Sequence, residues 1–435
     1  MTARRSFKSD ISFLEKISMG ATGTLATFKN LKNQGHNPIE LERGSTSFKI
    51  WKDIKIKRIR VPDILCIDCG RCVECRTKTK LEISMSHSRA DPERGWDYGL
   101  DDTDCIALVV CSRAGEEPIN WEVSGPIQFI PVKDLRSAQK EGLTRITQPK
   151  GMREGFEMRL IWPTKVANYN GIATSIDQER IQYQREPDGR TITLKLIKKK
   201  SVMNPLIQES EKVVKNQIVA SFIPVLFSFP CEKSISEDHY IRMLSSTSIS
   251  KRYAAAKALA FFVSARAEDV LQQRINDLNE HIYVRLEAAT SLAHQTNAHG
   301  YEFIKKCLSD EYVQNRLEAV IVLGEIHEDV SCQILIDTLL DKKQHPEIRA
   351  GAAWAIGELR NKMALASLVE SFSAVEKPIR IEAARALASG ISWALSKAGK
   401  VTIPDVLDLL VDDDARQWIA YIIGCLLYTS DAADE

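Results

Sequence analysis

The sequence lacks the two features that most quickly reveal a protein's class, a long apolar run and a familiar catalytic motif. The best candidate for a membrane span, residues 218–229, is shorter than a bilayer requires and contains Pro224. The patterns GxxxxGK(S/T), GxSxG and HExxH are absent. These absences argue against a transmembrane helix and give no sequence support for a P-loop NTPase, a serine hydrolase or a zinc protease.

Secretion signals and a disulfide framework are also missing. Acidic residues at positions 10 and 15 interrupt any apolar signal-peptide core near the N-terminus. Ten cysteines in 435 residues are too sparse for a secreted disulfide scaffold. We therefore expect reduced thiols, a cytoplasmic location and no membrane partner.

Charge is small in total but unevenly distributed. The chain carries a net charge of +1, whereas residues 1–80 contain 17 Lys or Arg against 8 Asp or Glu. A basic region of this kind suits an anionic partner, and nucleic acid is the foremost candidate. A solvated lysine-rich surface has the same composition, so charge alone leaves both interpretations open.

The C-terminal half contains an internal repeat. An arginine followed by small and aliphatic residues at helical spacing recurs six times, with steps of 33, 31, 33, 31 and 36 residues. A second helical stripe lies between copies, for example at Leu335, Ile336 and Leu339. Each repeat is therefore predicted to be two short helices that bury their apolar faces only by stacking. The arginines that begin the motifs are Arg252, Arg285, Arg316, Arg349, Arg380 and Arg416.

This pattern resembles the short HEAT-like repeats of the phycobilisome-lyase type over residues 240–424. The resemblance implies an α-solenoid, an α-α superhelix whose concave face binds a protein partner. It also implies that the motif arginines brace neighbouring repeats and are structural. Residues 425–435 look like the translation of a sequencing adapter, and we expect them to be foreign to the protein.

Residues 151–235 are predicted to form a small β-barrel. Over residues 164–221 the order of strands and turns resembles the barrel-sandwich hybrid segment of bacterial RNA polymerase β subunits, although Lys215-Asn216 stands where that segment has Lys-Gly. The resemblance concerns a structural module and implies no polymerase activity. The clearest predicted strands are 171–176, 180–185 and 191–196.

Residues 1–150 are predicted to form a basic α+β module. Residues 10–34 look helical. Residues 55–65 and 72–85 are predicted to be the two strands of a hairpin, and the second of them alternates with period 2. Gly70 supplies the positive φ that the turn between them needs. Residues 105–111 are apolar enough to form a central strand.

The hairpin carries four cysteines, from Cys66 to Cys75, in the spacing C-x2-C-x2-C-x2-C. Cys72 and Cys75 would point to opposite faces of a strand, so both cannot join Cys66 and Cys69 on one metal ion. Cys66 and Cys69, followed by a glycine, are typical of a zinc knuckle, but the further ligand pair that Zn²⁺ requires is missing nearby. Bound Zn²⁺ and free thiols therefore stay as alternatives.

Acidic and basic residues of the same hairpin resemble the motif of the PD-(D/E)XK nuclease superfamily. Asp63 follows a proline before the turn, and Glu74-x-Arg76 with Lys78 comes after it. The resemblance implies that Asp63 and Glu74 ligate Mg²⁺, which prefers oxygen ligands and activates bound water. Arg76 or Lys78 would take the place of the family's catalytic lysine, and Glu42 would be an upstream acid. The alternative is a basic strand with incidental acids.

The sequence thus predicts a multidomain protein: a basic α+β module over 1–150, a small β-barrel over 151–235 and HEAT-like repeats over 236–424. The leading hypothesis is a scaffold that binds a protein partner through its repeats while the basic module engages nucleic acid or a second partner. The alternative is a Mg²⁺-dependent nuclease in which the repeats act as a positioning arm.

Overall fold

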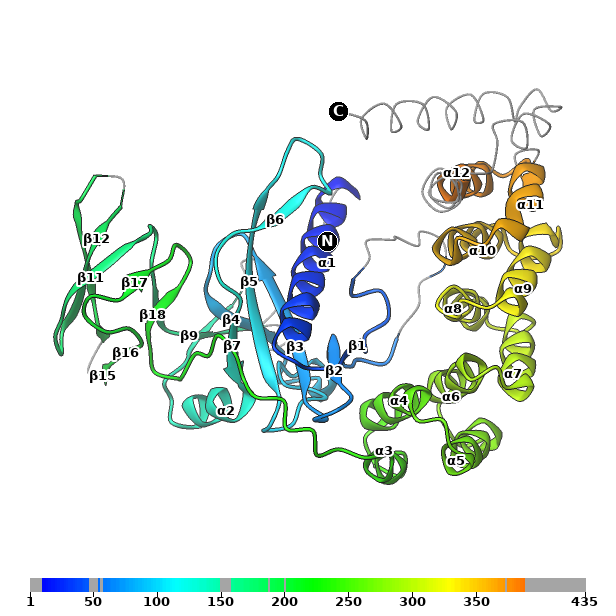
Figure 1. Ribbon diagram of the computed structural model, residues 1–435, viewed down its shortest axis with the longest axis horizontal. Helices are drawn as coiled ribbons and strands as arrows, with labels where there is room; N and C mark the ends of the chain where they lie inside the picture. The colour runs from blue at the N-terminus through cyan, green and yellow to red at the C-terminus, as the bar shows by residue number, and fades with distance from the viewer. Residues whose placement is uncertain are drawn as a thin grey trace, which may run out of the picture. The chain divides into compact units, whose positions relative to one another are not determined.

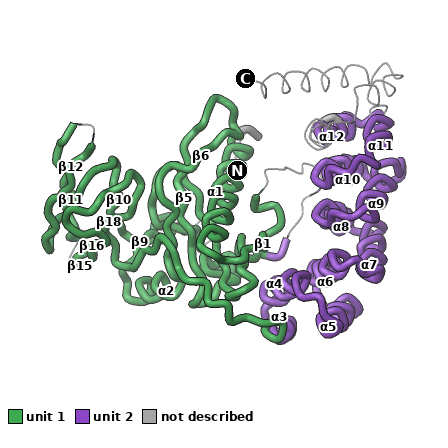
Figure 2. Tube along the Cα trace, in the orientation of Figure 1, with its two compact units in different colours: residues 1–50, 60–239 green, residues 51–59, 240–435 purple. Residues whose placement is uncertain are grey.

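A computed structural model describes most of the chain and divides it into two compact units (Figure 2). Unit 1 comprises residues 1–50 and 60–239, and unit 2 comprises residues 51–59 and 240–435. Unit 2 resumes at residue 240, close to the predicted start of the repeats at residue 236. The described residues are 10–46, 54, 58–148, 158–186, 188–198, 201–371 and 374–387.

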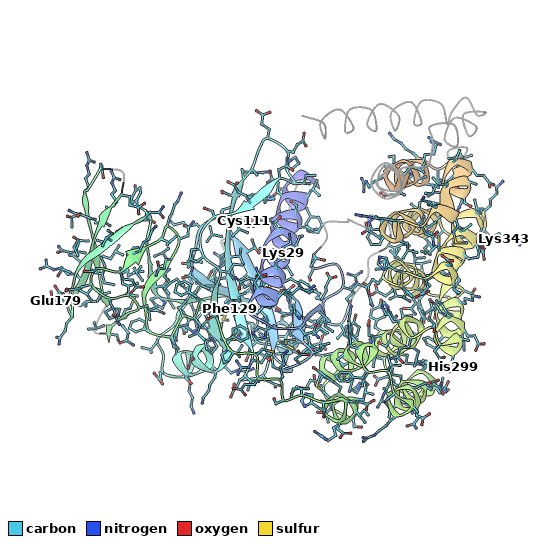
Figure 3. All side chains as sticks on the ribbon, viewed as in Figure 1. Lys29, Cys111, Phe129, Glu179, His299 and Lys343 are labelled. Carbon is cyan, nitrogen blue, oxygen red and sulfur yellow. The ribbon has the colours of Figure 1, made fainter. Side chains whose placement is uncertain are left out.

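Unit 1 is built on a mixed sheet with strand order β1-β2-β3-β5-β6, in which β7 also pairs with β5. Strands β1, β2 and β3 form an antiparallel meander, and β3 runs parallel to β5. Strand β5 is buried over most of its length, as predicted for a central strand, and Figure 3 labels Cys111 on it. The strands are β1 (Pro38–Glu40), β2 (Ile64–Cys66), β3 (Cys72–Lys78), β5 (Cys105–Arg113), β6 (Trp121–Val123) and β7 (Gln128–Pro131).

Helix α1 (Asp10–Asn33) packs on this sheet against β3 and β5, and it confirms the helix predicted over 10–34 (Figure 1). Gly23 permits the close approach, because a Cβ at that position would lie 1.8 Å from the hydroxyl oxygen of Thr77 on β3. Leu31 of the helix and Cys75 of β3 belong to one buried apolar cluster. This face of β3 is therefore core, and the side chains that alternate with it lie on the opposite face.

The strand predicted over 55–65 is wrong in length. Among the described residues, 58–63 lie outside any strand, and β2 begins only at Ile64. Pro62 accounts for the late start, because proline has no N–H to donate to a strand ladder. The turn after β2 is confirmed, with Gly70 at a φ of +69°.

The return strand predicted over 72–85 is also too long. Strand β3 ends at Lys78, the chain leaves the sheet over 79–82, and β4 (Ile83–His87) pairs with β9 in a second sheet of order β4-β9-β8. After the short β2–β3 hairpin, the chain therefore continues in a different sheet. The remaining elements of this region are η1 (Pro92–Arg94), α2 (Val132–Lys140), β8 (Arg145–Thr147) and β9 (Met158–Trp162).

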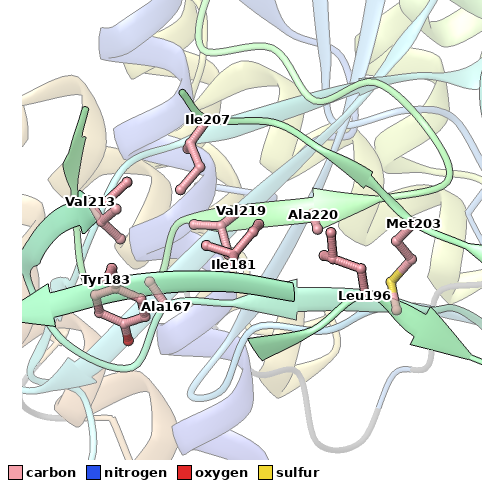
Figure 4. Close-up of a cluster of buried hydrophobic side chains, with 10 residues drawn as sticks. Ala167, Ile181, Tyr183, Leu196, Met203, Ile207, Val213, Val219 and Ala220 are labelled. Carbon is pink, nitrogen blue, oxygen red and sulfur yellow. The ribbon is translucent and has the colours of Figure 1, made fainter. Parts of the chain in front are cut away.

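Strands between residues 164 and 221 form small separate sheets, and no closed barrel of the kind predicted is found among the described residues there. The sheet orders are β13-β12-β11-β17, β10-β18-β16 and β14-β15. The two larger sheets share one core, in which Ile181 and Tyr183 of β12 meet Val219 and Ala220 of β18 (Figure 4). Several strands are only two residues long, too short to close a ladder into a ring.

The individual strands of this region agree well with the sequence patterns. Asn216, in the turn where Lys-Gly was the expected pattern, has a φ of +67°, which asparagine tolerates better than most residues. The strands are β10 (Thr164–Val166), β11 (Gly171–Ile176), β12 (Arg180–Arg185), β13 (Thr191–Lys195), β14 (Ile197–Lys198), β15 (Ser201–Val202), β16 (Asn204–Pro205), β17 (Lys212–Val213) and β18 (Ile218–Ser221).

The described part of unit 2 is an array of paired helices that ends at residue 386, and the first helix of the series begins three residues before the unit boundary. Helices α4, α6, α8, α10 and α12 form one layer, and α5, α7, α9 and α11 form the other (Figure 1). The helices are α3 (Glu237–Met243), α4 (Ile249–Ala258), η2 (Leu259–Phe261), α5 (Ala265–Asn276), α6 (Ile282–His294), α7 (Ala298–Leu308), α8 (Val313–Leu323), α9 (Asp329–Leu340), α10 (Pro346–Leu359), η3 (Lys362–Ala364), α11 (Leu365–Glu370) and α12 (Lys377–Ala386).

Each motif arginine in the described part of the array stands at the fourth position of its helix, from Arg252 in α4 to Arg380 in α12. The guanidinium groups bind the chain that leads into the helix. Arg285 and Arg349 donate from Nε to the carbonyl oxygens of Ile275 and Leu339, at 2.8 and 2.9 Å. These contacts agree with the expected structural role, and Arg416 lies outside the described residues.

Among the described residues, no helix is both long and apolar enough to cross a bilayer. The predicted repeats beyond residue 387, and the tail at 425–435, lie outside the described residues.

Candidate functional site

Asp63 and Glu74 lie opposite each other at the start of the β2–β3 hairpin. The pairing of Ile64 with Val73 and of Leu65 with Cys72 places Asp63 across from Glu74 one step further along the register. Backbone positions opposed in this way are about 5 Å apart. The Asp63 carboxylate is tied to β3, because its Oδ2 accepts a hydrogen bond from the Cys75 N–H at 2.6 Å.

Charge on these acids is concentrated on one face of β3. Burial raises the pKa of Asp63, which is only 8% exposed, and the carboxylates of Glu74 and Glu42 raise it further. The Cys75 N–H and the Arg76 guanidinium act in the opposite direction. Three carboxyl groups therefore interact here, an arrangement that favours a shared cation or a shared proton.

Both basic residues of the predicted site already have partners. Arg76 pairs with Glu74, Nη1 to Oε1 at 2.8 Å, and this neighbour raises the pKa of Arg76. Lys78 donates from Nζ to the carbonyl oxygens of Glu82 and Ser84, at 2.6 and 2.9 Å. Burial lowers the pKa of Lys78 to about 8.

Carboxylate oxygens are the ligands that Mg²⁺ prefers, and the charges of Glu74 and Glu42 act on the Asp63 carboxyl group from two other stretches of chain. Among the described residues, these three acids do not bring one oxygen each within 4.8 Å of all the others. A metal ion would compete with Arg76 for Glu74, because the Arg76 guanidinium already pairs with the Glu74 carboxylate. Of the predicted site residues, Asp63, Glu74 and Arg76 form one interacting group, and Lys78 lies further along β3 and is turned toward β4.

A second group of potential ligands lies at the other end of the hairpin. His36, Cys66, Cys69 and Cys231 are referred to below as the Cys/His cluster, and one ligand atom from each lies within 4.8 Å of all the others. Cys66 and Cys69 were the residues of the predicted zinc knuckle. His36 and Cys231 were not predicted from the sequence. His36 follows α1 and Cys231 lies in the extended segment after β18, so neither has a recognisable spacing to the knuckle.

Neither of the remaining hairpin cysteines belongs to the cluster, whereas the alternation of strand residues had predicted only that both could not join it. Cys72 is buried in β3, and its N–H donates to Asp104 Oδ1 at 2.7 Å. Cys75 faces α1, where burial raises its pKa. Within the cluster, a hydrogen bond from the Cys69 thiol lowers the pKa of Cys66 to about 4. All nine cysteines of the described residues are free thiols.

Unit 2 has a polar site of its own, in which Ile54 and Arg58 contact helices of the array. The Ile54 N–H donates to the Glu347 carboxylate of α10, and Arg58 donates from Nε to Oε2 of Glu318 on α8 at 3.2 Å. The Glu318 side chain is only 3% exposed. Glu287 and Glu382 stand at the position equivalent to Glu318 in their own repeats and are also buried.

Comparison with known proteins identifies the repeats. Residues 301–388 match the family model of HEAT repeats. With the paired helices and the recurrent arginine, this match shows that the described helices of unit 2 form an α-solenoid of HEAT-like repeats. No curated protein matches the sequence.

Parts of this chain are similar to several solved structures at low identity and low TM-score. The complex of CpcE and CpcF of phycocyanin lyase from Nostoc sp. PCC7120 is 18% identical over 46% of this chain and 81% of that chain, with a TM-score of 0.29. A designed armadillo repeat protein in complex with peptide (KR)4 is 18% identical over 44% of this chain and 100% of that chain, with a TM-score of 0.27. Human deoxyhypusine hydroxylase in complex with glycerol is 14% identical over 35% and 83%, with a TM-score of 0.20. Likeness at this level carries no conclusion about activity or partners.

Proposed function

We propose that unit 1 is a divalent-cation-dependent nuclease and that the HEAT-like repeats form an arm that binds a protein partner. The register that sets Asp63 opposite Glu74, with the charge of Glu42 acting on the same carboxylate, supports the nuclease function most strongly. The basic composition of residues 1–80 supports a polyanionic substrate.

In this mechanism Asp63 and Glu74 would hold Mg²⁺, with Glu42 as a further acid beside them. Bound Mg²⁺ would polarise a substrate phosphate and lower the pKa of a water molecule. Arg76 stays charged at any physiological pH and can turn from Glu74 to a phosphate oxygen, an anion that its planar guanidinium recognises well. Lys78, with a pKa of about 8, can hold or release a proton near neutral pH.

A cleavage assay on the full chain tests this function. Labelled single- and double-stranded DNA and RNA would be incubated with the protein in Mg²⁺, in Mn²⁺ and in EDTA. We expect metal-dependent cleavage that is lost in Asp63→Asn and in Glu74→Gln and kept in Glu116→Gln, an exposed acid elsewhere in unit 1. Cleavage that persists in Asp63→Asn would reject the assignment.

Binding without cleavage is the alternative outcome of the same experiment. If the wild-type chain retains nucleic acid in a salt-dependent way but leaves it intact, unit 1 is a binding module. Each phosphate neutralised on duplex DNA should then contribute about −0.9 to the log–log slope of affinity against salt. No binding at roughly 50 mM salt would reject both hypotheses.

The contacts of residues 54 and 58 support the protein-binding role of the repeats. In these contacts a main-chain N–H and a guanidinium donate to buried glutamates. A main-chain N–H and a guanidinium are the donors that an extended basic segment offers to an acidic surface. We expect a partner with such a segment to use the same glutamates on the face formed by α8 and α10.

A peptide with the sequence of residues 51–60 tests this role. Fluorescence anisotropy should show that it binds the full chain, more tightly in Arg58→Ala, where the chain's own segment competes less. Glu318→Gln should weaken binding, whereas Glu311→Gln, at an exposed position near the start of α8, should not. Equal affinity in the two glutamate variants would contradict the proposed surface.

A further inference from the structure

The Cys/His cluster is assembled from three parts of unit 1 that are far apart in sequence. His36 follows the C-terminus of α1, Cys66 and Cys69 flank the turn after β2, and Cys231 belongs to the extended segment that precedes the repeats. His36 and Cys66 are buried, and the other two side chains are half-buried. None of the four belongs to the acidic face of β3, so the nuclease hypothesis does not use them.

We propose that these four residues bind one zinc ion in a closed structural site. Three cysteines and one histidine are a common ligand set for structural zinc, and such sites are four-coordinate and tetrahedral. Because Cys72 and Cys75 lie on opposite faces of β3, the Cys66–Cys69 knuckle would be completed by ligands from other elements.

Distances between the ligand atoms agree with a tetrahedron. With zinc–sulfur bonds of about 2.3 Å, two sulfur ligands lie roughly 3.8 Å apart, and a sulfur and a nitrogen are slightly closer. The Sγ atoms of Cys66 and Cys231 are 3.8 Å apart, and Sγ of Cys69 is 3.7 Å from Nδ1 of His36. A disulfide would instead require an S–S distance of about 2.05 Å.

The orientation of His36 favours metal binding. Its Nε2 lies 3.0 Å from the carbonyl oxygen of Phe229, and a carbonyl can only accept a hydrogen bond, so Nε2 carries the proton. In the neutral imidazole, which is the form that binds a metal, the lone pair is then on Nδ1, the atom that lies 3.7 Å from Sγ of Cys69. A backbone carbonyl that fixes the ring in this way is a typical outer-shell partner of a metal-bound histidine.

The backbone of the turn also has the shape that a knuckle needs. The Gly70 N–H donates to the Cys66 carbonyl at 2.8 Å, and the Cys66 N–H donates to the Arg71 carbonyl at 2.9 Å. A φ of +69° at Gly70 closes the turn, and a side chain there would be strained. Cys66 and Cys69 thus present their sulfur atoms on the same side of a tight loop.

Zinc at this position would fasten the segment that leads to the repeats onto the sheet. Cys231 is held beside the turn by other contacts as well, since the Ile235 N–H donates to the Asp68 carbonyl at 3.1 Å. A metal ion adds a cross-link between residues 165 positions apart, whose stabilising effect grows with the length of the loop it closes.

Metal analysis of the full chain tests the site. Protein purified under reducing conditions should contain one zinc per chain by mass spectrometry of the metals. Cys231→Ser and His36→Gln should lose it, whereas Cys332→Ser, a buried free thiol of unit 2, should retain it. Full zinc occupancy in both ligand variants would overturn the proposal, and so would iron in place of zinc.

A measurement on the wild-type chain covers the case in which a ligand variant fails to fold. Exchange of zinc for Co²⁺ should give the visible d–d bands of tetrahedral cobalt and a sulfur-to-cobalt charge-transfer band. An octahedral cobalt spectrum, or an intact mass that shows a Cys66–Cys231 disulfide in metal-free protein, would overturn the site.

Discussion

The contacts inside unit 1 and those inside unit 2 join residues at very different separations in the sequence. In unit 2 a motif arginine binds the chain only ten residues before it, as Arg349 does with the Leu339 carbonyl. In unit 1 the Cys/His cluster joins residues 36 and 231. Stability in a repeat array is therefore spread over many similar interfaces, whereas in unit 1 it depends on a few long-range contacts. Four predictions test this difference, from the largest effect to the smallest.

Removal of zinc should affect unit 1 far more than unit 2. Zinc contributes on the order of 10 kcal/mol to the folding of small metal-dependent domains. A strong zinc chelator should therefore open the region around the β2–β3 turn to protease, while the helix array stays protected. Limited proteolysis with mass mapping measures this, and earlier cleavage of the array would contradict it.

In unit 2 the largest single effect should come from a cavity in the helix core. Leu292 in α6 is fully buried, and Leu292→Ala should lower the free energy of unfolding by about 2–5 kcal/mol. Leu278 is 81% exposed, and Leu278→Ala should change it by less than about 0.5 kcal/mol. Denaturant unfolding compares the two, and similar losses would mean that the array is packed differently.

Two glycines of α1 should respond to alanine with opposite signs. At Gly23 a Cβ would lie 1.8 Å from Oγ1 and 2.8 Å from Cβ of Thr77, so Gly23→Ala should destabilise unit 1 by about 1–3 kcal/mol. At Gly20 a Cβ would meet nothing within 4 Å, so Gly20→Ala should stabilise the helix by about 0.5–1 kcal/mol. Thermal unfolding measures both, and a neutral Gly23→Ala would show that α1 does not pack on β3 as described.

The smallest effect concerns the pH dependence of Asp63. Its pKa is raised in the folded state, so its stabilising contribution is complete below the unfolded pKa of about 3.9 and is lost as the pH rises through the folded pKa. Without divalent cations, wild type should lose stability relative to Asp63→Asn as the pH rises from about 4. Unfolding curves at several pH values measure the difference.

Asp188 provides a control with the opposite sign. The hydrogen bond from Arg185 lowers the pKa of Asp188, so its contribution is present above the unfolded pKa and is lost as the pH falls. The comparison of wild type with Asp188→Asn should therefore show the reverse trend. The same trend in both variants would mean that the pKa of Asp63 is not raised in the folded protein by burial and by the neighbouring acids.

The sequence by itself determined much of the fold wherever neighbouring residues decide it. The spacing of the arginines and apolar residues predicted the helix pairs of unit 2, because each helix packs on elements adjacent in the chain. The same holds for the turn at Gly70 and for the approach of Asp63 to Glu74, because a tight hairpin fixes its own register.

Only the tertiary structure decided the features that join distant segments. The strands predicted over 55–65 and 72–85 are shorter in the structure, because Pro62 delays the start of β2 and because β4 pairs in a second sheet. Between residues 164 and 221 the short strands form small sheets where a barrel was expected. Ile54 and Arg58 belong to unit 2, where they bind the buried glutamates Glu347 and Glu318 of the repeats. His36 and Cys231 reached the knuckle because α1 and the segment after β18 pack on the same sheet. The spacing of residues along the chain cannot predict such long-range contacts, because they depend on how all the elements pack together.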